Sequence, residues 1–217
     1  GRADAPKFKS GTEKAMIVAV SGNLATGKTT LTKIIEEELG FIRVAENPQQ
    51  NEFLPDFYAD MERWCLQSQL SFIVSRSSSL LEAQKKGSNI AIDRTVSEDV
   101  FVFCRALNNY GILSDRELRV ILEAYELICR AIPSPDLYIY LDDSTDRIID
   151  RIYRKAIPYE QGIEREYIEK ISEFYRRWLT MINPLKVSRI ITSDVDFTNP
   201  HGRREVVSKL QQFLLRN

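Results

Sequence analysis

Residues 15–30 read AMIVAVSGNLATGKTT, an apolar run followed by a glycine-containing loop and the start of a helix-forming stretch. Within this stretch, residues 22–29 match the phosphate-binding P-loop pattern G-x-x-x-x-G-K-[ST]. Glycines let backbone N–H groups turn toward an anion, and the N-terminus of the following helix adds partial positive charge. Because the flanking strand and helix patterns agree with the loop, a chance match is disfavoured. The chain is therefore predicted to bind a nucleoside triphosphate.

The size and charge of the chain limit what else it can be. Its 217 residues, 43% of them hydrophobic, are enough for one substantial core, so we expect one domain over residues 15–217. Residues 1–14 are polar and are expected to be a flexible extension or a cloning remnant. A net charge of −1 disfavours nucleic acid as a partner. Apolar runs are too short for a membrane span, so we expect no membrane association.

The three cysteines carry no metal-ligand or disulfide spacing. Cys65, Cys104 and Cys129 lie far apart, each within an apolar helical pattern. They are interpreted as reduced core residues of a cytoplasmic protein.

Short apolar runs alternate with long helical patterns along the chain. This order predicts a three-layer α/β domain, a P-loop kinase fold with a central five-stranded parallel sheet flanked by helices and a helical lid. In such folds the site lies at the carboxyl ends of the strands. The expected strands are 16–20, 41–45, 89–92, 137–141 and 189–192, and the expected helices are 55–85, 96–109, 114–131, 144–156, 164–182 and 201–215.

Candidate catalytic carboxylates follow the second and third expected strands. Glu46 is placed to take a proton from a hydroxyl acceptor, although a solvated loop carboxylate would look the same. Asp93 can hold Mg²⁺ in the manner of a Walker-B acid, and Arg94 can contact the acceptor or the transferring phosphoryl group. A structural ion pair at the strand end is the alternative reading of these two residues.

Five motifs in order are similar to those of the deoxyribonucleoside kinase family, which includes deoxycytidine, deoxyguanosine and bacterial deoxyadenosine kinases. The resemblance covers the chain from about Met16 to its C-terminus. The motifs are GNLATGKTT (22–30), E-…-N-x-F-L-x-x-F-Y (46–58), E-R-W-x-x-x-x-Q (62–69) running on to Ser75-Arg76, D-R-T-x-x-x-D (93–99), and R-I-Y with E-Q-G-I-x-x-E-Y-I-E-K (151–170).

The resemblance implies a role for each matching residue. It implies that Glu46 is the catalytic base for a nucleoside 5′-hydroxyl, with Arg94 and Lys28 acting on the phosphates and Thr29 and Asp93 holding Mg²⁺. For the nucleoside, it implies that Tyr58 and Glu160 bind the sugar 3′-hydroxyl, that Gln69 reads the base edge, and that Arg76 and Asp99 favour an amino-bearing base over thymine. Arg76 and Asp99 would also be compatible with a helix-to-helix salt bridge. Trp64, with Phe53, Phe57 and Phe101, is expected to sandwich the base, although aromatic residues at helical spacing are more often core.

ATP is the expected phosphoryl donor. The expected contacts are Asn23, Leu24, Ala25, Thr26, Gly27, Lys28, Thr29, Thr30, Arg151, Lys155, Asp194, Asp196 and Phe197. The lid, about 151–163, departs from the family's R-x-x-x-R-x-R pattern because Lys155 and Ile157 stand at the second and third arginine positions. Lysine lacks the bidentate fork of arginine, and isoleucine donates no hydrogen bond. Arg154 lies one residue out of register.

The leading hypothesis is an ATP-dependent kinase acting on the 5′-hydroxyl of a purine deoxynucleoside or deoxycytidine. The departures in the lid leave open a catalytically weak nucleotide-binding subunit with an assembly role. A nucleoside-monophosphate kinase is less favoured, because the lid offers few basic residues for an acceptor phosphate. The helices at 96–109 and 114–131 resemble those through which relatives form homodimers.

Overall fold

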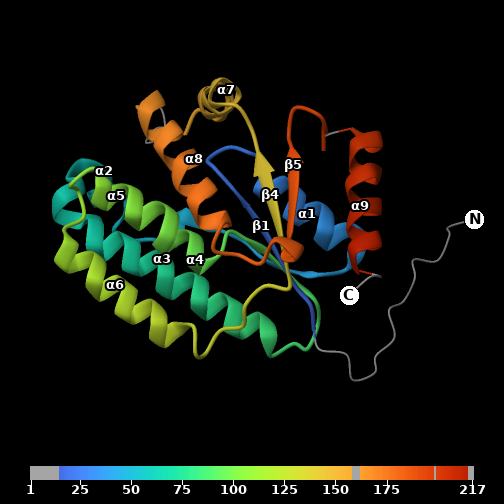
Figure 1. The fold of residues 1–217 in the computed structure, drawn as a ribbon, viewed down its shortest axis with the longest axis horizontal. Coiled ribbons are helices and arrows are strands. Elements are labelled where there is room, and N and C mark those ends of the chain that lie inside the picture. The colour runs from blue at the N-terminus through green and yellow to red at the C-terminus, as the bar shows by residue number, and fades with distance from the viewer. Residues whose placement is uncertain (1–14, 158–161, 198, 215–217) are drawn as a thin grey trace, which may run out of the picture.

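A parallel β-sheet organises the chain in this computed structural model, which describes residues 15–157, 162–197 and 199–214. Its strand order is β2-β3-β1-β4-β5, and every pair is parallel (Figure 1). This arrangement confirms the predicted α/β fold with a central five-stranded sheet. The strands are β1 (Ile17–Gly22), β2 (Ile42–Val44), β3 (Ile90–Asp93), β4 (Leu137–Asp142) and β5 (Val187–Ile191).

Helices cover both faces of the sheet. In the longer elements the expected helices agree with the structure to within a few residues at each end, apart from two differences described below. The helices are α1 (Lys28–Leu39), α2 (Leu54–Ala59), α3 (Met61–Gln84), α4 (Val96–Glu98), α5 (Arg105–Asn109), α6 (Asp115–Ile128), α7 (Thr145–Lys155), α8 (Arg165–Leu179) and α9 (Pro200–Leu214).

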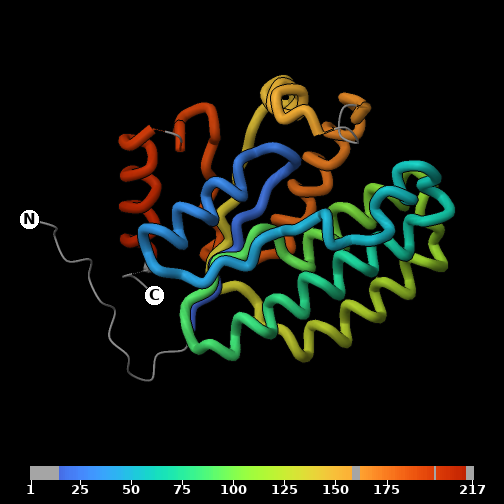
Figure 2. Tube along the Cα trace, turned by 180° about the vertical axis from the view of Figure 1, so that it is seen from behind, coloured from blue at the N-terminus to red at the C-terminus, as the bar shows by residue number. Residues whose placement is uncertain are grey.

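Alternate residues of β1 point to opposite layers, which explains why this strand is apolar throughout. Val18 and Val20 pack in a cluster with α1 and α9, whereas Ala19 packs in a cluster with α8 and the chain segment following β3. Figures 1 and 2 show α1 and α9 on one side of the sheet and α8, α3 and α6 on the other. Both faces of β1 are therefore buried, as the lack of alternation predicted.

The helix predicted over 55–85 is in fact two helices that meet at Asp60. The Asp60 backbone N–H ends α2 by donating to Asp56, and its side chain begins α3 by accepting a 3.1 Å hydrogen bond from the Arg63 backbone. With φ at −149° and ψ at 86°, Asp60 leaves the helical region. Aspartate is a favoured N-cap residue, and its capping bond compensates for the break.

The segment predicted as one helix over 96–109 contains a π-helical stretch, Asp99–Cys104, between α4 and α5. A capping box starts it: the Thr95 side chain accepts from the Glu98 backbone while the Glu98 side chain accepts from the Thr95 backbone. π-Helical turns inside helices are often found at functional sites, and this one begins five residues after Arg94.

Two further observations concern burial and length. Cys65 and Cys104 are buried free thiols as expected, but Cys129 is exposed because α6 ends at Ile128, so the core assignment was wrong for Cys129. Within the described part of the chain, no helix has the length and apolar character needed to cross a bilayer.

Candidate active site

The loop between β1 and α1 has a backbone that glycine makes possible. Gly22 has φ +146°, and a Cβ there would lie 2.6 Å from the carbonyl oxygen of Leu141 on the neighbouring strand β4. Gly27 precedes α1 with φ +99°, a region that other residues rarely adopt. The structure therefore explains why both of these positions in the P-loop motif are glycine. The loop lies at the carboxyl end of the central strand.

Lys28 folds back over this loop. Its Nζ donates a 2.7 Å hydrogen bond to the carbonyl oxygen of Asn23, and Thr26 donates to the same oxygen over 3.0 Å. Burial, assisted by the nearby positive charge of Arg94, lowers the pKa of Lys28 to about 8. The ammonium thus lies in a partly desolvated position where phosphate oxygens would be strong partners.

Thr29 and Asp93 meet at the ends of α1 and β3. The Thr29 hydroxyl donates a 2.6 Å hydrogen bond to Oδ2 of Asp93. The other carboxylate oxygen, Oδ1, is buried and has no hydrogen-bond partner among the described residues. Buried polar atoms are nearly always paired, so this oxygen indicates a missing ligand. A hydroxyl and a carboxylate beside a phosphate-binding loop fit Mg²⁺, which takes few protein ligands and keeps waters and phosphates.

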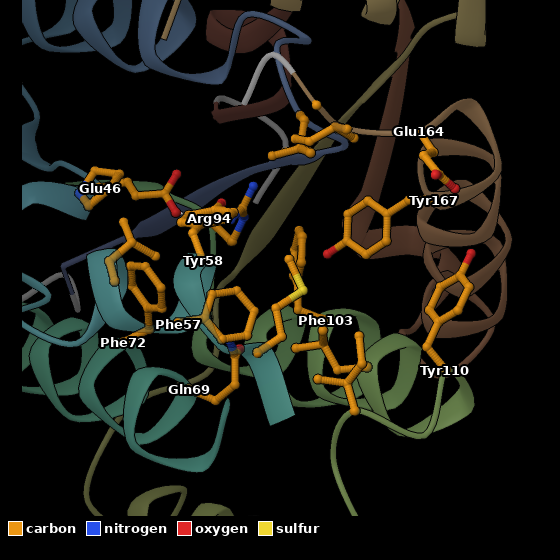
Figure 3. A pocket seen from close by; sticks show the side chains of 18 residues that line it. Glu46, Phe57, Tyr58, Gln69, Phe72, Arg94, Phe103, Tyr110, Glu164 and Tyr167 are labelled. Atoms are coloured by element: carbon orange, nitrogen blue, oxygen red, sulfur yellow. Dashed lines mark hydrogen bonds and ion pairs between the residues drawn. The ribbon is translucent and has the colours of Figure 1, made fainter. Parts of the chain in front are cut away.

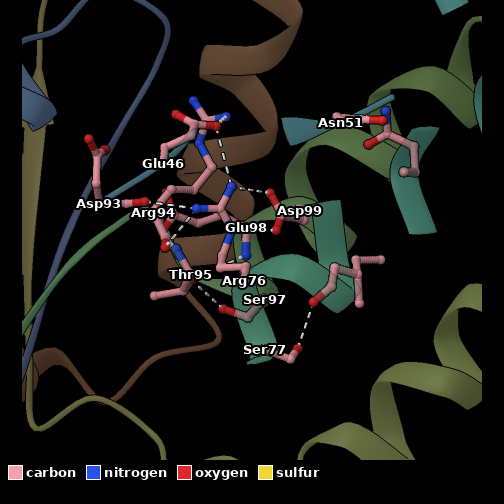
Figure 4. Close-up of polar contacts among 12 residues, drawn as sticks. Glu46, Asn51, Arg76, Ser77, Asp93, Arg94, Thr95, Ser97, Glu98 and Asp99 are labelled. Carbon is pink, nitrogen blue, oxygen red and sulfur yellow. Dashed lines mark hydrogen bonds and ion pairs between the residues drawn. The ribbon is translucent and has the colours of Figure 1, made fainter. Parts of the chain in front are cut away.

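Arg94 adopts an unusual backbone conformation directly after β3. Its φ is +69°, which is rare for a residue with a side chain and costs conformational energy. The guanidinium donates a 2.9 Å hydrogen bond from Nη1 to Oε1 of Glu46 and lies 4.2 Å from the centre of the Phe103 ring (Figure 4 shows the polar contacts). The strained backbone aims the arginine at the carboxylate rather than into solvent.

Glu46 lies two residues beyond β2 and is surrounded by positive charge. Burial raises its pKa, but the charges of Arg94, Arg76 and Lys28 outweigh burial, and the net pKa is lowered to about 2. The carboxylate is therefore ionised at neutral pH. Glu46 is not the solvated loop carboxylate that its sequence position also allowed, because only 18% of its side chain is exposed.

Arg76 on α3 connects Glu46 to Asp99. The guanidinium donates from Nε to Asp99 over 2.7 Å and from Nη2 to both Asp99 and Glu46 over 3.3 Å. Its Nη1 donates to the backbone oxygens of Asp93 and Arg94. These bonds occupy the donor capacity of the arginine. Arg76 and Asp99 thus form the helix-to-helix salt bridge that the sequence left open.

Glu98 is a buried carboxylate that the sequence did not single out. It accepts hydrogen bonds from Ser21 of β1 (2.8 Å), from the Thr95 backbone (2.8 Å) and from Tyr175 of α8 (2.8 Å). Burial raises the pKa of Glu98. The T-x-x-E spacing of a capping box was the available sequence signal, but it does not show that the acid also reaches two other elements.

A cavity of about 690 Å³ opens beside Glu46 and Arg94 (Figure 3). Figure 3 shows these two residues along one side, with Glu164 and Tyr110 across from them. Of the residues predicted to bind an acceptor, Glu46, Tyr58, Gln69, Arg94 and Phe57 line it. The sequence did not indicate several other lining residues, which are Phe72, Phe103, Leu107, Tyr110, Ile112, Ile163, Glu164 and Tyr167.

The aromatic wall differs from the predicted one. Trp64 is outside the set of described residues that line the cavity; its ring stacks on Phe53 with centroids 6.0 Å apart. Five residues separate Trp64 from Gln69, which turns them roughly 140° apart on α3. Phe101 packs edge-to-face on Tyr125 at 5.3 Å. The expected sandwich by Trp64, Phe53 and Phe101 is therefore corrected: Phe57, Phe72 and Phe103 supply the phenylalanine rings of the wall.

Among the expected donor residues, Leu24 lines the cavity, whereas Arg151 and Phe197 approach the P-loop from α7 and from the segment after β5. Arg151 of α7 donates to the carbonyl oxygen of Ala25 over 3.3 Å, and the Phe197 ring would lie 3.8 Å from a Cβ at Gly27. Lys155 and Arg154 are exposed at the end of α7, and Asp194 is exposed after β5. Glu160 lies outside the described residues, so its expected contact with the sugar stays a prediction.

Comparison with known proteins identifies the family. A family model described as deoxynucleoside kinase matches residues 18–215. The chain belongs to the deoxynucleoside kinase family. The chain is accordingly an ATP-dependent deoxynucleoside kinase, which is a phosphotransferase.

Curated deoxynucleoside kinases are moderately similar to this chain over most of its length. The deoxyadenosine/deoxycytidine kinase of Bacillus subtilis (strain 168) is 29% identical over 88% of this chain and 89% of its own length. The deoxyadenosine kinase of Dictyostelium discoideum is 28% identical over 88% of this chain and 77% of its own length. The deoxyguanosine kinase of Bacillus subtilis (strain 168) is 27% identical over 74% of this chain and 77% of its own length.

Solved structures show the same deoxynucleoside kinase fold. The deoxyadenosine kinase from M. mycoides with bound dCTP has a TM-score of 0.79 and 22% identity, and it covers 91% of this chain and 100% of its own. The same enzyme with bound dATP has a TM-score of 0.77 and 23% identity, and it covers 90% of this chain and 100% of its own.

Proposed function

We propose that this deoxynucleoside kinase transfers the γ-phosphoryl group of ATP to the 5′-hydroxyl of a purine deoxynucleoside or deoxycytidine, as a single kinase domain over residues 15–217. The observation that carries the proposal is the pairing of Glu46 with Arg94 at the edge of the aromatic cavity and next to the P-loop. A hydroxyl bound in the cavity would meet a base and a cation at the side nearest the phosphates.

Catalysis by this arrangement rests on positioning and charge. Glu46, ionised at neutral pH, accepts the hydrogen bond of the 5′-hydroxyl and takes its proton as the phosphoryl group moves. Arg94 is aimed by its backbone at the point between acceptor and donor, where it stabilises charge on the transferring group. Lys28, partly desolvated over the P-loop, binds the β- and γ-phosphates together with the loop N–H groups of residues 23–30.

Mg²⁺ is the proposed metal, held by Thr29 and Asp93. The unpartnered Oδ1 of Asp93 supports this assignment, and no cluster of three or more metal-binding side chains occurs in the ranges that the structure describes. A site with few protein ligands suits Mg²⁺, because phosphate oxygens and waters complete its octahedron. When bound, the metal neutralises charge on the β- and γ-phosphates.

Recognition of the base is proposed to depend on Gln69, whose carboxamide faces the cavity from α3. A carboxamide offers one donor and one acceptor edge, which matches a base that carries both. Asp99 and Arg76 are bonded to each other and are not among the described residues that line the cavity. The proposed preference for an amino-bearing base therefore assigns the acceptor to Asp99 alone, because the N–H groups of Arg76 are already occupied. Phe57 and Phe72 contribute apolar wall at the cavity, and we assign no base contact to Trp64.

The sugar and the donor are assigned to different residues, some of which belong to the lid. Tyr58, which lines the cavity, and Glu160 are proposed to bind the 3′-hydroxyl. Arg151 is proposed to contact ATP from α7, supported by its position against the P-loop backbone. Lys155, Asp194, Asp196 and Phe197 are proposed to complete the donor site within the lid (about 151–163) and the segment after β5, with Phe197 next to Gly27.

We further propose that the chain acts in the cytoplasm as a homodimer. Its substrates are small molecules, and it acts on neither nucleic acid nor membranes. Support for the dimer comes from apolar side chains exposed on α6, where Val120 and Leu127 are 50% and 63% exposed, and from Val74 on α3 at 60%. Val120 and Leu127 lie seven residues apart and therefore on one face of α6, and apolar residues that gather on one face favour association. Light scattering of the purified chain should give twice the monomer mass, and a monomer mass at micromolar concentration would contradict the dimer.

Phosphoryl transfer to a panel of nucleosides tests the function. The chain is incubated with ATP, Mg²⁺ and deoxyadenosine, deoxyguanosine, deoxycytidine, thymidine or their ribose counterparts, and the 5′-monophosphate is identified by mass. Turnover of an amino-bearing deoxynucleoside with none of thymidine is expected. Thymidine as the preferred substrate would contradict the base assignment, and ATP binding without any turnover would contradict the kinase proposal.

A further inference from the structure

Two arginines of α7 converge on one aspartate at the donor side of the P-loop. Asp143, directly after β4, has a side chain that is only 1% exposed. Its Oδ2 lies 2.7 Å from Nη1 of Arg151, and its Oδ1 lies 3.0 Å from Nε of Arg147. The Ser144 backbone and the Thr192 hydroxyl donate to the same carboxylate. A buried carboxylate with this many donors is fixed in place.

The same two arginines reach the elements around a donor nucleotide. Arg151 donates to the carbonyl oxygen of Ala25 in the P-loop and, over 3.5 Å, to the hydroxyl of Thr192 after β5. Arg147 donates to the carbonyl oxygen of Thr192 over 3.4 Å. Asp143 therefore connects the end of β4, the first turns of α7, the P-loop and the end of β5 through two guanidinium groups.

The cluster of Asp143, Arg147 and Arg151 is relevant because the lid lacks arginine at two positions of the family pattern. Lys155 points into solvent at the C-terminal end of α7, and the following arginine position is occupied by Ile157. Arg147 and Arg151 lie one helical turn apart on α7; Arg151 reaches the P-loop, and Arg147 reaches Thr192 after β5. Their side chains are 46% and 29% exposed, so the N–H groups not used by Asp143, Ala25 or Thr192 remain open to a ligand.

We propose that Asp143 is a positioning residue for the phosphoryl donor: it holds Arg151, the first arginine of the family's lid pattern, against the P-loop and holds Arg147 beside it, so that Arg147 adds an arginine contact where positions 155 and 157 have none. The inference rests on the proposed function, because it takes the P-loop nucleotide to be the donor. Asp143 itself touches no substrate; it acts through the orientation of the two arginines.

Replacing Asp143 by asparagine tests this inference, since the change keeps the size of the side chain and removes its charge. The matched control is Asp142→Asn: the neighbouring aspartate pairs with Arg189 on β5 and contacts neither Arg147 nor Arg151. For each variant, KM for ATP is measured at saturating nucleoside and KM for the nucleoside at saturating ATP. The Kd of ATP is measured by calorimetry without nucleoside.

For Asp143→Asn we expect KM and Kd for ATP to rise by about tenfold, because the arginines lose their fixed orientation. The nucleoside KM should stay within about twofold of the parent value, because a substitution rarely affects a distant site with which it shares no contacts. Asp142→Asn should leave both KM values at the parent level. An unchanged Kd for ATP, or equal increases in both KM values, would overturn the inference.

A double-mutant cycle separates positioning from a general loss of structure. Once Arg151→Gln and Arg147→Gln are introduced together, adding Asp143→Asn should weaken ATP binding no further, because the aspartate acts through these arginines. A further loss of affinity as large as in the parent background would refute the inference. Thermal unfolding checks that each variant is folded, and a variant that unfolds is replaced by Asp143→Ser. If the parent binds ATP but transfers nothing, the proposed function fails, while the ATP affinities still decide whether Asp143 positions the arginines.

Discussion

The guanidinium of Arg94 donates a 2.9 Å hydrogen bond to Oε1 of Glu46, and the hydrogen bonds that other described residues make to this carboxylate fall on the same oxygen. Arg76 supplies the second of them. No other described residue is seen to donate to Oε2, and Glu46 lines the cavity, so we expect an acceptor hydroxyl to bind at this oxygen. The ion pair would then hold the proposed base in place without using the oxygen that receives the proton.

Glu46→Gln should lower kcat by about 100- to 10,000-fold, the usual contribution of a general base. Glutamine keeps the shape of the side chain but has no charge to accept the proton, so the Kd of the nucleoside should change little. Rapid-quench measurement of product and calorimetry of the nucleoside give the two quantities. Glu52→Gln, on the exposed side of the same loop, is the control and should behave as the parent. Undiminished turnover in Glu46→Gln would remove Glu46 from the mechanism.

ATP binding should take up protons above about pH 8. Because burial lowers the pKa of Lys28 from its ordinary 10.5 to about 8, the free protein has largely lost this proton at pH 9. Bound phosphates raise the pKa again, since they favour the ammonium form. The affinity for ATP should therefore fall as pH rises from 8 to 10.

Calorimetry at pH 9 in two buffers of different ionisation enthalpy measures this uptake. The observed enthalpies should differ by a fraction of one proton times the difference in buffer enthalpy. Identical enthalpies in both buffers would show that Lys28 does not change protonation on binding.

Phe72→Ala should raise the KM of the nucleoside by about tenfold, because an aromatic wall of the cavity is lost. Trp64→Ala removes a larger ring that packs on Phe53 outside the cavity and should leave this KM within about twofold. Steady-state kinetics at saturating ATP give both values, with Tm as a check on folding. A larger effect from Trp64 than from Phe72 would restore the base contact that the sequence predicted for Trp64.

Arg76→Gln should destabilise the protein by about 3–5 kcal/mol, because it leaves the buried charge of Asp99 without a partner. Urea unfolding measures the free energy. Arg177→Gln is the comparison: this arginine is 67% exposed and pairs with Glu173 on the surface, so its loss should cost less than about 1 kcal/mol. Equal costs for the two changes would show that the buried network contributes no special stability.

Local motifs made much of this molecule predictable. Strand ends decide where the P-loop, Glu46, Asp93 and Arg94 lie, because each of them follows a strand. The strands can be located from apolar runs that the sequence shows directly. The parallel sheet brings these ends to one edge whatever the details of the connections. For the same reason Thr29 and Asp93, which two separate motifs assigned to one metal site, lie within hydrogen-bond distance of each other, while the metal itself stays a prediction.

The residues that the sequence assigned wrongly lie on helices, and how a helix is rotated when it packs decides which of its residues reach the cavity. Trp64 and Phe72 are both aromatic residues of α3, whose apolar residues are spread around its axis, and only the docking of α3 decides which of them meets the cavity. Asp60 resembles any helical aspartate until its backbone is seen to leave the helix. Asp143 and Glu98 gain their importance from partners that are far away in the sequence and that no local pattern reveals.

The π-helical stretch from Asp99 to Cys104 works as one additional residue absorbed into a helix. In a regular α-helix one added residue would turn everything after it by about 100°, since each residue advances by that angle. The widened turn takes up the added residue locally, so Leu107 beyond it keeps its place in the cavity wall and Phe103 lies within it. This wall of the cavity can therefore accommodate a change in the length of the segment while Arg94, upstream of it, stays where it is.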